Sequence, residues 1–144
     1  MLGARLSAGE VVELVSDLGG GKTTFVRGLA RGLGSADTVA SPTFVLSRIY
    51  HGRAGRKLYH YDFYRLSEPG VLADQLAEAL ADPKGIIVIE WAKQLQKGLP
   101  AERWVVKFEP LPEDSDQRRI VIEYPPTAVG LVDQLESDWQ TVKA

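Results

Sequence analysis

A glycine-rich stretch that ends in a lysine and two threonines is the part of this chain best suited to chemistry. It reads Ser16-Asp17-Leu18-Gly19-Gly20-Gly21-Lys22-Thr23-Thr24. An apolar run precedes it and an amphipathic run follows it, which predicts a strand, a turn and a helix in that order. This layout is typical of a P-loop, in which backbone N–H groups and the positive end of the helix dipole bind phosphate.

The residue types of this motif indicate a nucleoside triphosphate and Mg²⁺. Lys22 would bring a positive charge to the terminal phosphates, and Thr23 would offer its hydroxyl to Mg²⁺. Glycines allow positive φ and a close approach of the backbone to phosphate oxygens. The residues expected to bind the nucleotide are Asp17, Leu18, Gly19, Gly20, Gly21, Lys22, Thr23 and Thr24.

The first position of the motif departs from the usual pattern G-x-x-x-x-G-K-[ST], because Ser16 stands where glycine is usual. If the backbone there requires positive φ, a serine is strained by about 1 kcal/mol or more. Ser16 would then weaken nucleotide binding. The alternative interpretation of the whole stretch is a glycine-rich turn that only joins a strand to a helix.

Two carboxylates at the ends of predicted strands are candidates for metal binding and catalysis. Asp62 lies near the end of a strand over 57–64, where a carboxylate can hold a metal-bound water, or else cap a turn or pair with Arg65. Glu90 ends the most apolar run of the chain, and a buried carboxylate is costly unless paired. It would orient or activate the attacking water, or else emerge into solvent. The expected metal site is Thr23, Asp62 and Glu90.

Three further residues have both a functional and a structural interpretation. Thr43, in Ser41-Pro42-Thr43-Phe44, would reach Mg²⁺ while the γ-phosphate is present, or else form a rigid strand entrance. His60 shares a strand face with Asp62 and would bond its carboxylate or sense phosphate, or else be a satisfied structural group. Trp91 would shield the site or stack on a base, or else pack in the core. The expected catalytic residues are Glu90, Asp62 and Thr43.

The pattern along the chain predicts the elements that must position these residues. Strands are expected over 10–15, 44–51, 57–64, 85–91, 104–109 and 119–124, with 112–117 as a mobile hairpin tip. Helices are expected after the P-loop to about 33, from about 70 to 82, and over about 128–139. Gly28 and Gly32 are expected to allow the helix that follows the P-loop to pack closely on the sheet. The fold class is therefore α/β, a three-layer P-loop NTPase-like sandwich with a mixed parallel and antiparallel sheet.

Composition narrows the class of protein. A chain of 144 residues predicts one domain over 1–144, and a net charge of −2 argues against direct binding of nucleic acid. The absence of cysteine excludes disulfides and thiolate metal sites. No apolar run is long enough for a membrane span and no leader is visible, so the cytoplasm is the expected location.

With these motifs in view, the chain resembles the TsaE (YjeE) family, small bacterial ATPases needed to make threonylcarbamoyladenosine on tRNA. The resemblance covers roughly residues 2 to 110. It departs from the family at Ser16, where the family has glycine, and at the N-terminus, where the family has a longer segment. The stretches that carry it are Asp17 to Thr24, Ser41-Pro42-Thr43-Phe44, Tyr59-His60-Tyr61-Asp62-Phe63-Tyr64-Arg65-Leu66 and Ile89-Glu90-Trp91.

The resemblance implies roles and partners. Lys22 and Thr23 would bind the phosphates of ATP and Mg²⁺, Thr43 would belong to a switch-like loop, Asp62 would support the metal, and Glu90 would be needed for hydrolysis. The partners would be a threonylcarbamoyl transferase and its inactive paralogue, with tRNA met through that complex. Hydrolysis would be slow alone, and a partner would complete the site.

Three other functions use the same loop. A small-molecule or nucleoside kinase is the main alternative, but kinases usually need an arginine-rich lid, and no arginines cluster after the third predicted strand. A GTP switch commonly has an Asn-Lys-x-Asp segment, which this chain lacks. A nucleotide-binding scaffold without turnover would be compatible with Ser16.

Overall fold

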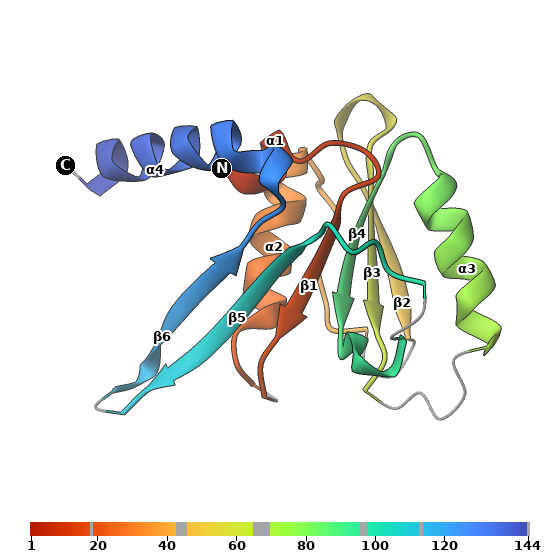
Figure 1. The fold of residues 1–144 in the computed structure, drawn as a ribbon, viewed down its shortest axis with the longest axis horizontal. Helices are drawn as coiled ribbons and strands as arrows, with labels where there is room; N and C mark the ends of the chain where they lie inside the picture. The colour runs from red at the N-terminus through yellow and green to blue at the C-terminus, as the bar shows by residue number, and fades with distance from the viewer. Residues whose placement is uncertain (18, 43–45, 65–69, 96–97, 113, 144) are drawn as a thin grey trace.

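The computed structural model spans residues 1–144 and describes all of them except 18, 43–45, 65–69, 96–97, 113 and 144. Its centre is a six-stranded sheet with the strand order β2-β3-β4-β1-β5-β6 (Figure 1). The strands are β1 (Val11–Val15), β2 (Ser47–His51), β3 (Lys57–Asp62), β4 (Gly85–Glu90), β5 (Trp104–Leu111) and β6 (Asp114–Glu123). The helices are α1 (Leu2–Arg5), α2 (Lys22–Leu33), α3 (Gly70–Ala81) and α4 (Val129–Lys143).

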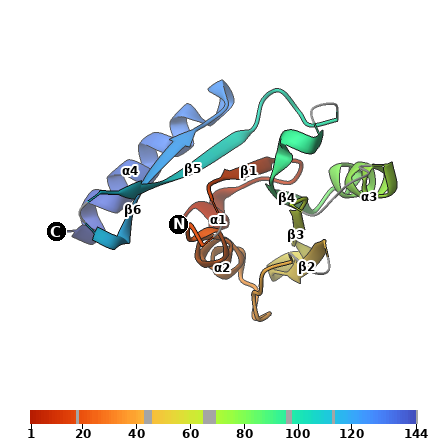
Figure 2. The same cartoon turned by 90° about the horizontal axis from the view of Figure 1, so that it is seen from below.

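The sheet is mixed, as the sequence predicts. The strand β1 runs parallel to both β4 and β5, and β3 runs parallel to β4. The outer strands β2 and β6 are antiparallel to β3 and β5. The helices α2 and α3 lie on opposite sides of the central strands (Figure 2), so that this part of the molecule has three layers. The predicted α/β class is confirmed.

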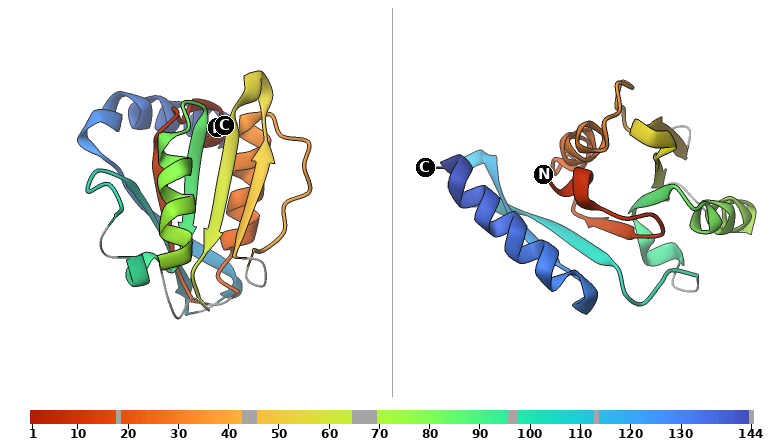
Figure 3. Two further views of the ribbon diagram at one scale, coloured as in Figure 1. Left: turned by 90° about the vertical axis from the view of Figure 1, so that its right-hand side faces the viewer. Right: turned by 90° about the horizontal axis from the view of Figure 1, so that it is seen from above.

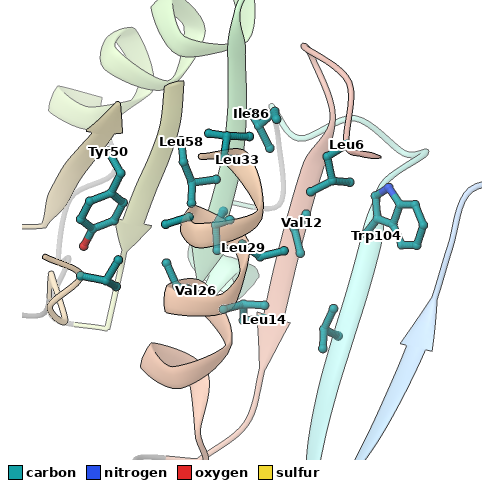
Figure 4. Packing of buried hydrophobic residues seen from close by; sticks show 14 of the residues in the cluster. Leu6, Val12, Leu14, Val26, Leu29, Leu33, Tyr50, Leu58, Ile86 and Trp104 are labelled. Atoms are coloured by element: carbon teal, nitrogen blue, oxygen red, sulfur yellow. The ribbon is translucent and has the colours of Figure 1, made fainter. Parts of the chain in front are cut away.

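Each face of the sheet has its own hydrophobic cluster. On one face, Val26, Leu29 and Leu33 of α2 pack on Val12, Leu14, Leu58 and Ile86 of the sheet (Figure 4). On the other face, residues of α3 pack with Ile87 and Ile89. All six residues of β4 are buried, because both faces of this strand are covered. The unbroken apolar run at 86–89 is therefore a central strand, as predicted.

The contact between α1 and α2 corrects the expected role of two glycines. A Cβ atom at Gly32 would lie 2.9 Å from the backbone nitrogen of Ala4, whereas a Cβ at Gly28 would meet nothing within 4 Å. Gly32 therefore allows the close approach of α1, not of the sheet, and Gly28 borders open space. The prediction failed because periodicity identifies an apolar face but not the neighbour of a small residue on another face.

The ribbon of β5 and β6 is longer than predicted. Residues 114–117, expected in a hairpin tip, belong to β6, because half-exposed antiparallel strands tolerate polar side chains. The helix α4 lies beside this ribbon (Figure 3), and it has no fully buried side chain among its described residues. Arg5 Nη2 and Asp138 Oδ2, 2.6 Å apart, link α1 to α4.

Among the described residues, none of the helices has the length and apolar character needed to cross a membrane.

Candidate functional site

The loop between β1 and α2 has the conformation that the motif predicts. Gly19 and Gly21 adopt positive φ, 75° and 100°, a region that glycine enters without a steric penalty. Gly21 is also the N-cap of α2, so the loop leads directly into the first turn of a 12-residue helix. The first N–H groups of a helix have no acceptor within it and suit an anion. Leu18 lies outside the described residues.

Ser16 is accommodated without the strain that positive φ would cause. The described non-glycine residues with positive φ are Leu46, Ala54 and Trp91, so Ser16 is not in that region. Its hydroxyl donates a hydrogen bond of 2.8 Å to Asp17 O. A Cβ atom at Gly20 would lie only 2.2 Å from Ser16 Oγ. The missing side chain of Gly20 thus makes the room that Ser16 needs.

The amine of Lys22 lies across the mouth of the loop. Its Nζ is 3.2 Å from Ser16 O and 3.3 Å from Asp17 O, and 4.8 Å from the centroid of the Trp91 ring. The residue is only 7 % exposed. No ion pair between described residues includes Lys22, so its charge faces carbonyl dipoles and an aromatic ring.

A cavity of about 280 Å³ brings most of the predicted residues together. Asp17 instead borders a neighbouring hollow, beside Ser16 and Trp91. Ser41, which the sequence did not single out, lies in the lining, and its position next to Pro42 in the Ser-Pro-Thr-Phe motif is the signal that would have found it. The lining residues are Gly19, Gly20, Gly21, Lys22, Thr23, Thr24, Ser41, Asp62, Glu90 and Trp91.

Thr43 lies outside the described residues, which stop at Pro42 and resume at Leu46. Leu46 N donates to Pro42 O over 2.7 Å, and Leu46 O accepts a hydrogen bond of 3.0 Å from Asp62 N. Leu46 has φ of 66°, which is uncommon for a residue with a side chain. These contacts join the segment that contains Pro42 to the end of β3.

Asp62 is the last residue of β3 and is 3 % exposed. Its Oδ1 accepts a hydrogen bond of 2.9 Å from Tyr64 N, so the carboxylate caps the turn that follows the strand. The same residue lines the cavity. Asp62 therefore caps a turn, as one of the two interpretations predicts, and its position in the cavity lining is compatible with the other. Arg65, the alternative partner, lies outside the described residues.

Glu90, the last residue of β4, does not emerge into solvent. It is 2 % exposed, and its Oε2 is 3.0 Å from His60 Nε2. His60 is fully buried and contacts Glu90, whereas the sequence suggested Asp62 or phosphate as its partner. The reason is the parallel register, which places Asp62 beside Glu90 and His60 beside Val88, so that all three polar side chains share the α2 face.

Trp91 lies between the cavity and the hydrophobic core. It lines the cavity under Lys22, and it packs against the hydrophobic cluster on the α3 face. Its φ of 60° is a backbone conformation that side chains disfavour, and such conformations gather at functional sites. The centroids of the Tyr64 and Trp91 rings are 4.8 Å apart, a contact that no pattern in the sequence indicated.

The chain is similar to known proteins over most of its length. Residues 1–121 match the family described as threonylcarbamoyl adenosine biosynthesis protein TsaE. The chain is 43 % identical over 100 residues to the tRNA threonylcarbamoyladenosine biosynthesis protein TsaE of Treponema pallidum, which is 69 % of this chain and 73 % of that protein. It is 36 % identical over 122 residues to the protein of that name from Bacillus subtilis, covering 85 % and 72 % of the two chains.

A solved structure shows the same fold. The crystal structure of YdiB from Bacillus subtilis superposes with a TM-score of 0.72 at 28 % sequence identity. The superposition covers 96 % of this chain and 83 % of that one. The fold is P-loop NTPase-like, and the family match includes every residue of the cavity. This chain therefore belongs to the TsaE family.

Proposed function

We propose that this chain is an ATP-binding and ATP-hydrolysing, Mg²⁺-dependent subunit needed for threonylcarbamoyladenosine modification of tRNA. The observation that carries the proposal is one cavity lined by the P-loop, the buried Lys22 and two buried carboxylates, Asp62 and Glu90. The carboxylates end adjacent parallel strands, in register with each other. In open α/β sheets, ligands bind at the carboxyl ends of the strands.

The loop fits a triphosphate. A Cβ at Gly19 would meet nothing within 4 Å, so a ligand can approach the backbone there. The nearest polar partners of Lys22 Nζ are the carbonyls of Ser16 and Asp17. A phosphate oxygen would replace these neutral acceptors with a negatively charged one, which adds Coulomb attraction to the ammonium group.

The oxygens around the cavity fit Mg²⁺, which prefers oxygen ligands and keeps several waters. Thr23, Asp62 and Glu90 would hold the ion directly or through water. No group of three or more His, Cys, Asp or Glu side chains suited to a metal occurs in the part of the chain that the structure describes, so phosphate and water would complete the coordination. When bound, Mg²⁺ would offset the negative charge on the phosphates.

The residues of the chain would then divide the work of hydrolysis. Lys22 and the loop N–H groups would hold the phosphates, and Glu90 would accept a hydrogen bond from the attacking water and orient it. Thr43 would reach Mg²⁺ while the γ-phosphate is present and release it after hydrolysis. The names of the relatives place those proteins in tRNA threonylcarbamoyladenosine biosynthesis, which supports a role in this modification. The partners would be a threonylcarbamoyl transferase and its inactive paralogue in the cytoplasm, with tRNA met through them.

Phosphate release from Mg·ATP tests the proposal, measured with the chain alone and with the transferase and its paralogue. We expect slow release alone and faster release with the partners. Transfer of phosphate to an added small-molecule or nucleoside acceptor would instead identify a kinase. Binding of ATP without release under either condition would identify a scaffold.

A further inference from the structure

The contact between His60 and Glu90 is unusual because both side chains are removed from solvent. The side chains are 0 % and 3 % exposed, and Nε2 lies 3.0 Å from Oε2. Glu90 lines the cavity and His60 does not, so the histidine stands behind the carboxylate as seen from the cavity. A buried carboxylate in a hydrophobic sheet needs such a partner.

The contact determines which nitrogen carries the proton. A carboxylate oxygen accepts hydrogen bonds, so His60 Nε2 must be the donor. Among the described residues, Nδ1 has no hydrogen-bond partner. In the neutral ring with the proton on Nε2, Nδ1 carries only a lone pair, which is less costly to leave unpaired than a buried N–H.

We propose that His60 is a positioning residue for Glu90. Its Nε2–H holds Oε2 and thereby directs Oε1 toward the cavity, where the attacking water would be bound. This inference rests on the proposed ATPase function and adds to it a residue that touches neither the nucleotide nor the water.

The surroundings explain why a glutamate at this position needs support. Its side chain has three torsions, and its neighbour in the register is the carboxylate of Asp62, which has the same charge. The hydrogen bond from the rigid His60 ring restricts those torsions. The centroid of the His60 ring lies 6.3 Å from that of the Tyr50 ring, which packs against it. Removing the hydrogen-bond partner that stands behind a metal-binding residue typically costs about 10- to 100-fold in metal affinity or activity.

The tautomer of His60 is the first test, because it is measured on the unmodified chain without nucleotide. Nitrogen-15 NMR of the two histidine rings should show His60 with a slowly exchanging proton on Nε2. An Nε2 without a proton, or one whose proton exchanges as fast as the ring protons of the exposed His51, would overturn the proposal. This measurement remains decisive even where a substitution at His60 prevents folding.

Substitutions separate positioning from packing. Gln keeps an N–H donor at about the distance of Nε2, whereas Asn is too short to reach Glu90. His60→Asn should lower kcat about 10-fold with the Kd for ATP changed less than about twofold, and His60→Gln should stay within about threefold of the unmodified chain. His51→Gln, which removes the exposed histidine, is the matched control and should change neither quantity.

A double-mutant cycle with Glu90→Gln gives the sharpest outcome. If His60 acts through Glu90, His60→Asn should change turnover less than about twofold once Glu90 is replaced. If the losses of turnover from the two single substitutions multiply in the double variant, His60 acts independently of Glu90 and the inference fails. If kcat, ATP affinity and melting temperature all fall together in His60→Asn, His60 has a structural role and the inference also fails. If the unmodified chain neither binds nor hydrolyses ATP, the proposed function itself fails; if it hydrolyses ATP and His60→Asn does so equally, only the inference fails.

Discussion

The two ends of the adjacent strands β3 and β4 both carry carboxylates, but their environments differ. At the amino end, Asp82 Oδ2 accepts hydrogen bonds from the Tyr59 hydroxyl at 2.6 Å and from Lys57 Nζ at 2.9 Å. Its Oδ1 accepts a third, of 2.9 Å, from Lys84 N. At the carboxyl end, Asp62 and Glu90 border a cavity, beside a lysine whose polar partners are backbone carbonyls.

This difference separates a structural carboxylate from the two for which we propose a role in hydrolysis. The hydrogen bond from Tyr59, followed by those from Lys84 N and Lys57, lowers the pKa of Asp82 to about 2, so the fold itself stabilises its ionised form. At the other end Lys22 and the two acids line one cavity, and the ion pairs of the described residues include none among these three side chains. Separated opposite charges around a cavity are suited to a ligand that carries both signs, as Mg·ATP does.

Lys22→Ala should have the largest effect at the carboxyl end. Removal of the ammonium group takes away a charged partner worth about 2–3 kcal/mol, so the affinity for ATP should fall about 100-fold, to the limit of detection. Titration calorimetry measures this loss. An unchanged affinity would mean that the carboxyl end is not a phosphate site.

Glu90→Gln should separate binding from turnover. The amide retains the shape of the side chain but is a weaker base, so phosphate release should slow about 100-fold while ATP stays bound. Single-turnover measurements with saturating ATP test this expectation. Equal rates for the variant and the unmodified chain would leave Glu90 as a packing residue, like the carboxylate at the amino end.

Asp62→Ala should reduce the affinity for ATP about 10-fold when Mg²⁺ is present and by less when it is replaced with EDTA. The expected reason is loss of an oxygen that supports the metal. Because Asp62 Oδ1 also caps the turn at Tyr64 N, Asp62→Asn is the matched control that retains an acceptor. Equal losses with and without Mg²⁺ would indicate a purely structural aspartate.

Asp82→Asn should have the smallest effect and should leave ATP binding unchanged. Since folding lowers the pKa of Asp82 from 3.8 to about 2, its ionised form adds stability that is complete above the unfolded value and disappears as the pH falls toward 2. The melting temperature of the unmodified chain should exceed that of the variant by about 2 °C at pH 6. The difference should shrink between pH 4 and pH 2. A constant difference across this range would contradict the assigned pKa shift.

Local sequence patterns were enough to predict most of the carboxyl end. The apolar run before Ser16 and the periodicity after Lys22 locate β1 and α2, and the ends of two other strands locate Asp62 and Glu90. Residues at strand ends gather at one edge whenever the strands are parallel. For this reason the cavity could be predicted without knowing the order of the strands.

The pairing of His60 with Glu90 could not be predicted in this way. It requires β3 to lie next to β4 in a given register, and strand order is a property of the whole sheet. The contact of Gly32 with α1 was missed for the same reason, since its neighbour also comes from a segment distant in the sequence. The extension of β6 through residues 114–117 was missed for another reason: polar residues in a half-exposed hairpin strand resemble a turn in composition.

A crystal structure with a non-hydrolysable ATP analogue and Mg²⁺ tests the central claim most directly. The account predicts phosphate density against the N–H groups of residues 19–23, the ammonium of Lys22 moved from Ser16 O and Asp17 O to a phosphate oxygen, and the metal between Thr23 and Asp62. Analogue density elsewhere on the molecule, with Lys22 still on the two carbonyls, would contradict it.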